Sequence, residues 1–444
     1  MEIWQFGGPA GTGGNATGAT GGSAQAVSLT RSRLLAVARS HPSWLDDRHE
    51  IVGYWVFAAY AIAVIMLASG QDAIWAAWAV PAYGVAALTL PRSRSWGVAL
   101  LTAAFAVAAP LLLMLAQGQL TDGMAVIERS ASLLVRNGTP YLPSWQLSSW
   151  LAYNPYLPAM ALFGLPSVAG LQGAPGNPQV WLVLVTVAAL GAALRTQVPH
   201  SVLRCPDCRH DLLRSTAFAV ACPVMALNLA VTTTDPPVVA LLLLALGLAN
   251  YPERTVAAAA ALGLACAMKP TVWLAIPVLA AMLRHRDGTW PAVRFTVTSV
   301  AFIAAASLPA VIANPVAMVQ NTVLFPLGLT HHLTPAQSLT PGDLLARAVP
   351  GGHAIAVTLL LVAGLAIAIS LVVRPPRDLR AATWRLAIGL TLIFALGPAE
   401  RFGYFIYPLA LAGWLLFTRK RGRQTPTPES GAWPMAPDLE RGPR

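Results

Sequence analysis

Long apolar runs alternate with short polar segments along most of this chain. Within the runs, apolar residues follow one another without strand-like alternation, which favours helices. Several runs approach the ~20 residues that a membrane-spanning helix needs. They cover residues 51–69, 73–90, 96–117, 179–195, 216–232, 237–250, 256–283, 294–312, 353–373, 382–397 and 402–418. The pattern predicts an all-α, polytopic membrane protein with about twelve transmembrane helices.

Two stretches leave the topology open. Residues 155–170 are apolar but contain Pro155, Pro158 and Pro166, and the run 256–283 contains Lys269-Pro270. In one topology, 155–170 crosses the membrane and 256–283 is a single span. In the other, 155–170 lies at the interface or re-enters, and 256–283 forms two helices. Each of these would span only about 20 Å of the ~30 Å hydrocarbon core, so its ends would need protein or a water cavity around them.

Basic residues distinguish the two topologies, because cytoplasmic loops carry an excess of Lys and Arg. With 155–170 at the interface, all but five basic residues face the cytoplasm; the five are Arg129, Arg136, Lys269, Arg347 and Arg401. The alternative moves five more outward, namely Arg195, Arg204, Arg209, Arg214 and Arg254. We therefore expect 155–170 at the interface and both termini in the cytoplasm, in a plasma (inner) membrane.

The composition agrees with this class of protein. Hydrophobic residues make up 56% of the chain and charged residues 11%, against about 25% charge in soluble domains. This excludes an ordinary soluble enzyme, and the net charge of +11 reflects cytoplasmic loops rather than a nucleic-acid surface.

We expect three regions along the chain. Residues 1–50 form a Gly-rich, disordered cytoplasmic tail with a basic segment and no cleavable signal peptide. Residues 51–418 form the membrane domain. Residues 419–444 form a basic, Pro-rich cytoplasmic tail that suits anionic lipid.

The preferred topology collects ionisable residues on the outer side, where each is a functional candidate. Lys269 is the sharpest, because it lies inside an apolar run, although a lysine there could also snorkel to the interface. Asp122 directly follows the third run and could cap a helix as well as act as a base. Asp235 lies in a TTTDPP turn and could likewise cap a helix or have a functional role. The other candidates are loop or turn residues: His331, His332, Glu400 and Arg401.

A carboxylate and several cations at an outer membrane surface suit transfer of a sugar from a lipid phosphate. The carboxylate takes the proton of the acceptor hydroxyl as general base. The cations stabilise the departing phosphate as negative charge develops on it.

Four segments resemble bacterial membrane glycosyltransferases of the GT-C fold, in particular family 87 (DUF2029), which includes polyprenyl-phosphate-mannose-dependent α-mannosyltransferases. They are Asp122 followed by LLVRNGTPY at 133–141, YNPYL at 153–157, GLACAMKP at 263–270 and QSL at 337–339. The resemblance covers residues 96–420 and implies a GT-C type fold.

The resemblance also implies roles for single residues. Asp122 would be the base, with Asp235 as a second catalytic acidic residue. Lys269 would hold the donor phosphate with Arg401, His331 or His332. We expect Tyr141, Gln337, Ser338 and Glu400 to contact substrate. The implied partners are a polyprenyl-phosphate-sugar donor, a glycan or glycolipid acceptor and membrane lipid, with no nucleic acid. No cofactor is predicted, although a divalent cation is compatible with this chemistry, and no residue is assigned as a metal ligand.

Three alternatives stay open. Cys205 and Cys208 with His200 and His210 resemble half of a zinc ribbon, but four ligands within eleven residues are cramped, so a basic loop is favoured. A transporter or lipid flippase would also place charges at membrane depth. A catalytically silent GT-C homologue is suggested by departures from the family pattern, such as Ala336 before Gln337.

Overall fold

The computed structural model describes residues 47–90, 96–118, 121–198, 206–231, 234–332, 338, 340–398 and 401–419. Across these ranges the chain is helical and contains no strand, which confirms the all-α fold class. The expected tails 1–50 and 419–444 fall almost entirely outside the described residues, because the first described helix, α2 (Asp47–Leu67), begins at Asp47 and the last, α19 (Ile406–Arg419), ends at Arg419.

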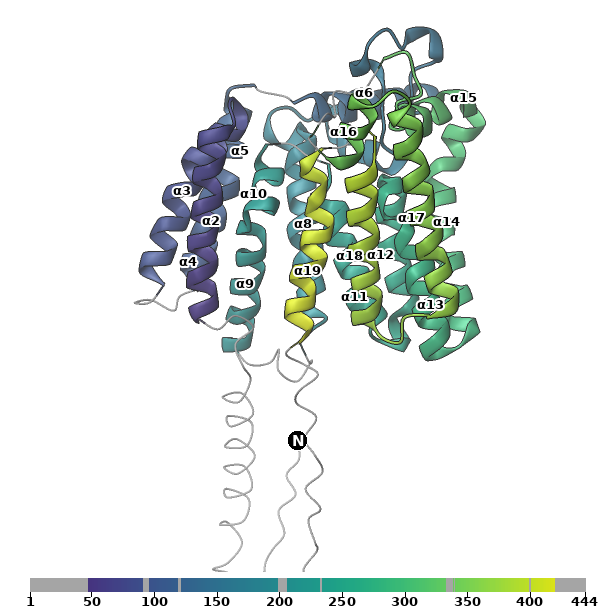
Figure 1. Ribbon diagram of the computed structural model, residues 1–444. Coiled ribbons are helices and arrows are strands. Elements are labelled where there is room, and N and C mark those ends of the chain that lie inside the picture. The colour runs from purple at the N-terminus through teal and green to yellow at the C-terminus, as the bar shows by residue number, and fades with distance from the viewer. Residues whose placement is uncertain are drawn as a thin grey trace, which may run out of the picture.

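Six helices within the described residues are long and apolar enough to cross a membrane. They are Arg48–Leu67, Trp96–Ala116, Pro178–Arg195, Thr289–Ala313, Gly352–Val373 and Leu379–Leu396. A seventh candidate is the bent pair α9 (Pro206–Ala221) and α10 (Pro223–Ala230). Shorter apolar helices, among them Pro236–Ala249 and Phe402–Leu415, pack between these long ones (Figure 1). The coarse prediction of a polytopic helical membrane protein therefore agrees with the structure.

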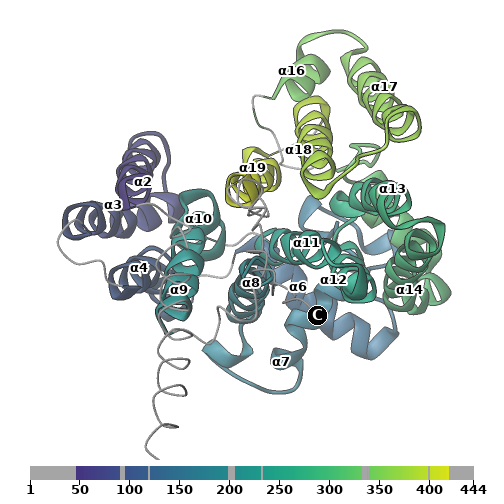
Figure 2. The same cartoon turned by 90° about the horizontal axis from the view of Figure 1, so that it is seen from below.

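Two groups of helices lie side by side when the molecule is seen from below (Figure 2). The first contains α2, α3 (Gln71–Thr89), α4 (Trp96–Ala103), α9 and α10, and a buried ion pair between Glu50 and Arg214 joins α2 to α9. The second is centred on α11 (Pro236–Ala249), which packs against both α8 (Pro178–Arg195) and α12 (Thr255–Met268). Nearly every residue of α11 is buried, so this helix is the core of the second group.

Around α11 and α12 lie α13 (Ala275–Asp287), α14 (Thr289–Ala313), α17 (Gly352–Val373), α18 (Leu379–Leu396) and α19. Short elements close one end of the bundle, the top in Figure 1: α6 (Asp122–Asn137), α15 (Pro315–Val319) and α16 (Pro341–Ala348). We call this the loop end; α2 begins and α19 ends at the opposite end.

The run 256–283 is broken where the sequence predicts. Helix α12 ends at Met268, Lys269 is extended with φ −144° and ψ 136°, and a 3-10 turn, η8 (Pro270–Leu274), leads into α13. Proline disfavours helical backbone in the residue before it, which explains the extended Lys269. Residues 155–170 likewise form a 3-10 helix, η4 (Pro158–Gly164), and the short α7 (Leu165–Val168) rather than one long helix.

Proline also reshapes two of the predicted runs. The run 216–232 is not one straight helix: α9 begins ten residues earlier, at Pro206, and the axis bends by 69° between Ala221 and Pro223. The run 96–117 contains a π-helical turn, η1 (Ala104–Ala108), ahead of Pro110 in α5 (Ala109–Ala116). Both distortions follow from the missing N–H and the bulky ring of proline.

Candidate functional site

The side chain of Lys269 lies at the break between α12 and α13 and contacts the start of α11. Its Nζ donates to Oδ1 of Asp235 over 2.7 Å. Asp235 precedes Pro236 at the N-terminus of α11, and its side chain makes no cap hydrogen bond to that helix. Two of the residues singled out in the sequence, 34 positions apart, therefore form an ion pair in the structure.

Three tyrosines surround this ion pair. The Tyr407 hydroxyl donates to the same Oδ1 of Asp235 over 2.7 Å. Lys269 Nζ also lies over two rings, at 5.3 Å from the centroid of Tyr156 and 5.5 Å from that of Tyr404. An ammonium is attracted to the faces of aromatic rings at such distances. The carboxylate and both rings thus hold the ammonium in one position.

The pair is removed from solvent. Lys269 is 7% exposed and Asp235 is 2% exposed, while Tyr407 is fully buried. A buried charge is costly unless it is paired and hydrogen-bonded, and both conditions are met here. Proteins in which apolar residues replace such a pair are often equally stable. The presence of the pair therefore marks a candidate functional site rather than a requirement for stability. We call Asp235, Lys269, Tyr156, Tyr404 and Tyr407 the lysine centre.

The segment 153–157 carries Tyr156 and is fixed on several sides. Leu157 N donates to Met268 O over 3.0 Å, which ties the segment to the residue before Lys269. Asn154 donates from Nδ2 to Ser130 Oγ over 2.9 Å, and its Oδ1 accepts from Tyr156 N over 3.0 Å. These bonds give the Tyr156 ring a defined place above Lys269.

Tyr141, expected to contact substrate, supports the same segment. It is 1% exposed, and its hydroxyl donates to Tyr156 O over 2.9 Å. Burial raises the pKa of the Tyr141 phenol, so it keeps its proton. In the structure the Tyr141 hydroxyl therefore holds the backbone of Tyr156, whose ring lies against Lys269.

Asp122 takes no part in the hydrogen bonds and ring contacts of the lysine centre. It is the first residue of α6 and is exposed, with Thr121 at the N-cap position. Within the described part of the chain it has no ion-pair partner. An exposed carboxylate at a helix N-terminus is stabilised by the helix dipole and is open to a substrate at the loop end.

The other predicted residues divide between described and undescribed positions. His331 is exposed, and the ring of the half-buried His332 lies edge-on to Tyr153, with centroids 6.5 Å apart. Ser338 Oγ accepts from Phe402 N over 3.0 Å, beside the exposed Arg401, and Arg401 O accepts from Tyr404 N over 3.0 Å. Gln337 and Glu400 lie outside the described residues.

The sequence did not single out Tyr404 and Tyr407, which complete the lysine centre. Both lie in the apolar run 402–418, where aromatic residues are ordinary. Their spacing of three residues is the one feature of the sequence that could have pointed to them. Residues three apart lie on the same face of a helix, so the two tyrosines can reach one site.

The four residues considered for zinc lie only partly in the described part of the chain. Cys205 and His200 lie outside it, while the His210 ring stacks on Trp96 with centroids 5.4 Å apart. Across the described ranges, no group of three or more His, Cys, Asp or Glu residues could hold a metal ion.

Comparison with known proteins adds no identity to this chain. No protein-family model matches it, and no curated protein or solved structure is significantly similar to it.

Proposed function

We propose that this protein is a GT-C type membrane glycosyltransferase that moves a sugar, mannose in the first instance, from a polyprenyl phosphate to an extracytoplasmic glycan or glycolipid. The observation that carries the proposal is the buried Lys269, held by Asp235 and two tyrosine rings at a helix break. A lysine fixed in this way offers a preorganised cation to a phosphate. The resemblance of 96–420 to family 87 enzymes is the second support.

The reaction assigns one task to each group. Asp122 takes the proton of the acceptor hydroxyl, and the acceptor oxygen forms a bond to the anomeric carbon. The bond from that carbon to the phosphate oxygen breaks, and its electron pair leaves with the polyprenyl phosphate. Lys269 stabilises the charge that develops on the phosphate, with Arg401 as a second cation on the Tyr404 side.

Asp235 takes a different part from the catalytic one that the resemblance implies. Its Oδ1 accepts from both Lys269 and Tyr407 and is buried. A carboxylate oxygen already engaged by two donors is better suited to holding Lys269 than to taking a proton from substrate. We therefore propose Asp235 and Tyr407 as positioning residues.

The proposal includes a topology of twelve crossings with both termini in the cytoplasm and the loop end outside. Several of these crossings use helices too short to span a bilayer alone, among them α11 and α12, each of 14 residues. Their ends at the lysine centre are buried, since Asp235 precedes α11 and Lys269 follows α12. Short helices persist in membranes where protein surrounds their ends.

The decisive experiment is a transfer assay. Membranes containing the full-length protein are supplied with polyprenyl-phosphate-[14C]mannose and a glycolipid extract as acceptor. We expect label in products that resist mild acid, which cleaves the donor. Label that stays in the acid-labile donor, as in membranes without the protein, would refute the proposal.

A transporter or lipid flippase is the second candidate, because transporters also use buried charges at helix breaks. It predicts movement of labelled polyprenyl-phosphate-mannose across the bilayer of reconstituted vesicles without formation of a new glycosidic product. If the protein is a transferase, the new glycosidic product forms, and its formation does not depend on movement of the donor between leaflets.

A further inference from the structure

A second polar site lies at the loop end, separate from the lysine centre. A cavity of about 260 Å³ opens between the end of α5, the middle of α6 and the turn that leads into α8. Glu128, Ser167 and Asn177 supply its polar groups, and Leu115, Leu171 and Ala174 supply apolar wall. The volume is far larger than one water molecule requires and lies just below the roughly 300 Å³ at which small-molecule pockets begin.

Glycines build the rim of this cavity. Gly118 and Gly173 adopt positive φ angles of 66° and 65°, which side chains rarely adopt. Gly176 is packed so closely that a Cβ would lie 2.1 Å from Leu171 O. The turn 171–177 is further held by hydrogen bonds from Leu171 N to Pro166 O and from Gly176 N to Gly173 O. The cavity is therefore a defined feature of the backbone.

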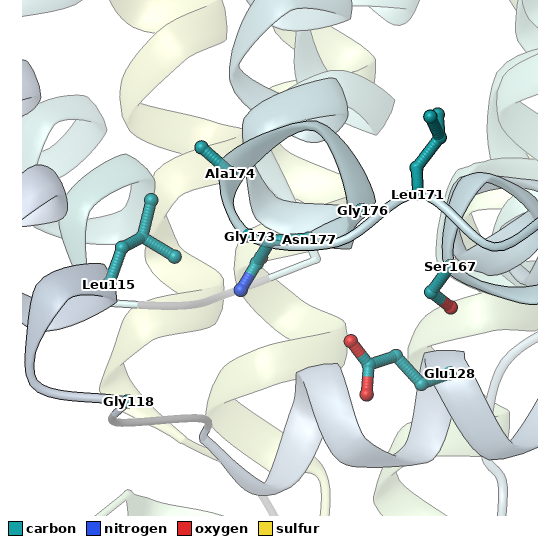
Figure 3. A pocket seen from close by; sticks show the side chains of 9 residues that line it. All are labelled: Leu115, Gly118, Glu128, Ser167, Leu171, Gly173, Ala174, Gly176 and Asn177. Atoms are coloured by element: carbon teal, nitrogen blue, oxygen red, sulfur yellow. The ribbon is translucent and has the colours of Figure 1, made fainter.

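The polar side chains converge on the open space. In Figure 3 the Glu128 carboxylate points into the cavity from α6, and the Asn177 amide nitrogen points inward from the turn. Ser167 lines the wall, with its hydroxyl donating to Gly164 O over 2.8 Å. Asn177 Oδ1 is already used, because it accepts from Gln179 N over 2.9 Å and caps α8. Its amide N–H groups remain for a ligand.

Glu128 has no ion-pair partner among the described residues. The neighbouring Arg129 is directed elsewhere, with its guanidinium bonded to Leu151 O and Ala152 O. None of the residues lining the cavity is basic. An anionic ligand would therefore meet an uncompensated carboxylate, whereas hydroxyl groups could donate to that carboxylate and accept from Asn177.

We propose that this cavity binds one sugar residue of the acceptor, with Glu128 and Asn177 as its hydrogen-bonding anchors; the assignment to the acceptor rests on the proposed transferase function. The leucines offer apolar surface to the C–H face of a sugar ring. The donor phosphate is excluded from the cavity by Glu128 and is left to Lys269.

The position of the cavity along α6 agrees with this assignment. Glu128 lies six residues after Asp122, and six residues of helix rise about 9 Å. Six residues also turn the helix by about 600°, so the two carboxylates project from different sides of α6. An acceptor sugar anchored in the cavity lies at the same end of the bundle as Asp122.

Binding can be measured without transfer. We propose ligand-observed saturation-transfer NMR with the full-length protein in nanodiscs, using methyl α-mannopyranoside as the probe and inorganic phosphate as competitor. The variants are Glu128→Leu and Asn177→Asp. The second keeps the oxygen that caps α8 but replaces the amide donor and adds a negative charge. Glu253→Leu, at an exposed carboxylate in a turn outside the cavity, is the matched control.

We expect the wild type and the control to give saturation transfer, each variant to weaken binding about tenfold, and phosphate to leave the signal unchanged. No signal from the wild type, equal signals from all proteins, or displacement by phosphate would each overturn the site. If binding behaves as expected while the wild type transfers no mannose, the saccharide site stands and the transferase function fails. If Glu128→Leu unfolds, Glu128→Gln replaces it, and we expect a smaller loss of binding.

Discussion

Tyr407 and Asp235 are 172 positions apart, yet the tyrosine hydroxyl donates to Asp235 Oδ1 over 2.7 Å. Lys269 donates to the same oxygen, so α11, the α12–α13 break and α19 meet at one atom. Each of these three elements ends or begins near this point rather than continuing past it. The lysine centre thus fixes the relative positions of four short helices, α11, α12, α13 and α19, that could not span a bilayer alone.

Removal of Asp235 should be costly. In Asp235→Ala the Lys269 ammonium is left buried without its carboxylate, and we expect a loss of about 3–5 kcal/mol in the free energy of unfolding. Tyr407→Phe keeps the ion pair and should cost about 1 kcal/mol. Denaturant unfolding in detergent micelles measures both. In Asp235→Ala/Lys269→Met most of the loss should be recovered, and strictly additive effects would contradict the coupling.

Lys269→Ala should act on the donor. Loss of a charge-assisted hydrogen bond to phosphate lowers kcat/KM for polyprenyl-phosphate-mannose about 10- to 100-fold. Arg286→Ala is the control, because Arg286 also pairs with a carboxylate, Asp287, at 2.7 Å, in the last turn of α13. Initial rates over a range of donor concentrations separate the variants. Equal donor kinetics in both would remove Lys269 from the phosphate site.

Asp122→Asn should lower kcat by about 10²–10⁴, the usual contribution of a general base, and leave folding intact because Asp122 is exposed. Asp378→Asn is a close control: Asp378 also stands at a helix N-terminus, where its Oδ1 accepts from Ala381 N, and asparagine preserves that cap. Single-turnover transfer at saturating donor is the measurement. Activity of Asp122→Asn at the level of the control would exclude Asp122 as base.

The two parts of the lysine centre differ in how far the sequence predicts them. The break at Lys269 follows from local chemistry, because Pro270 disfavours helix at the preceding residue. The pairing of Lys269 with Asp235 depends on which helices are neighbours, and runs that are apolar on all sides carry no periodicity to indicate it. Tyr407 was missed for this reason. The cavity at Glu128 was not predicted, because it depends on how the turn 171–177 folds against α6.

The topology can be tested with single cysteines in a chain whose four native cysteines are replaced. Trp145→Cys lies at a position 81% exposed, in the segment placed outside by both topologies. Glu253→Cys lies in an exposed turn that is cytoplasmic only if 155–170 does not cross the membrane. An impermeant maleimide applied to intact cells should label the first and not the second. Labelling of both from outside would restore 155–170 as a crossing.

Glu128 makes the stability of the protein depend on pH. Burial raises the pKa of Glu128 above its ordinary value of 4.5. The folded protein then binds this proton more tightly than the unfolded chain, so the contribution to stability is greatest below pH 4.5 and is lost as pH rises through the folded pKa. Glu128→Gln removes the titrating carboxyl, so its stability should decline less between pH 4.5 and the folded pKa of Glu128. Midpoints of thermal unfolding for both proteins, measured from pH 4 upward, give the difference. A wild type that gains stability relative to Glu128→Gln across the same interval would show that the carboxyl is stabilised in its charged form, and a cation would then have to face it.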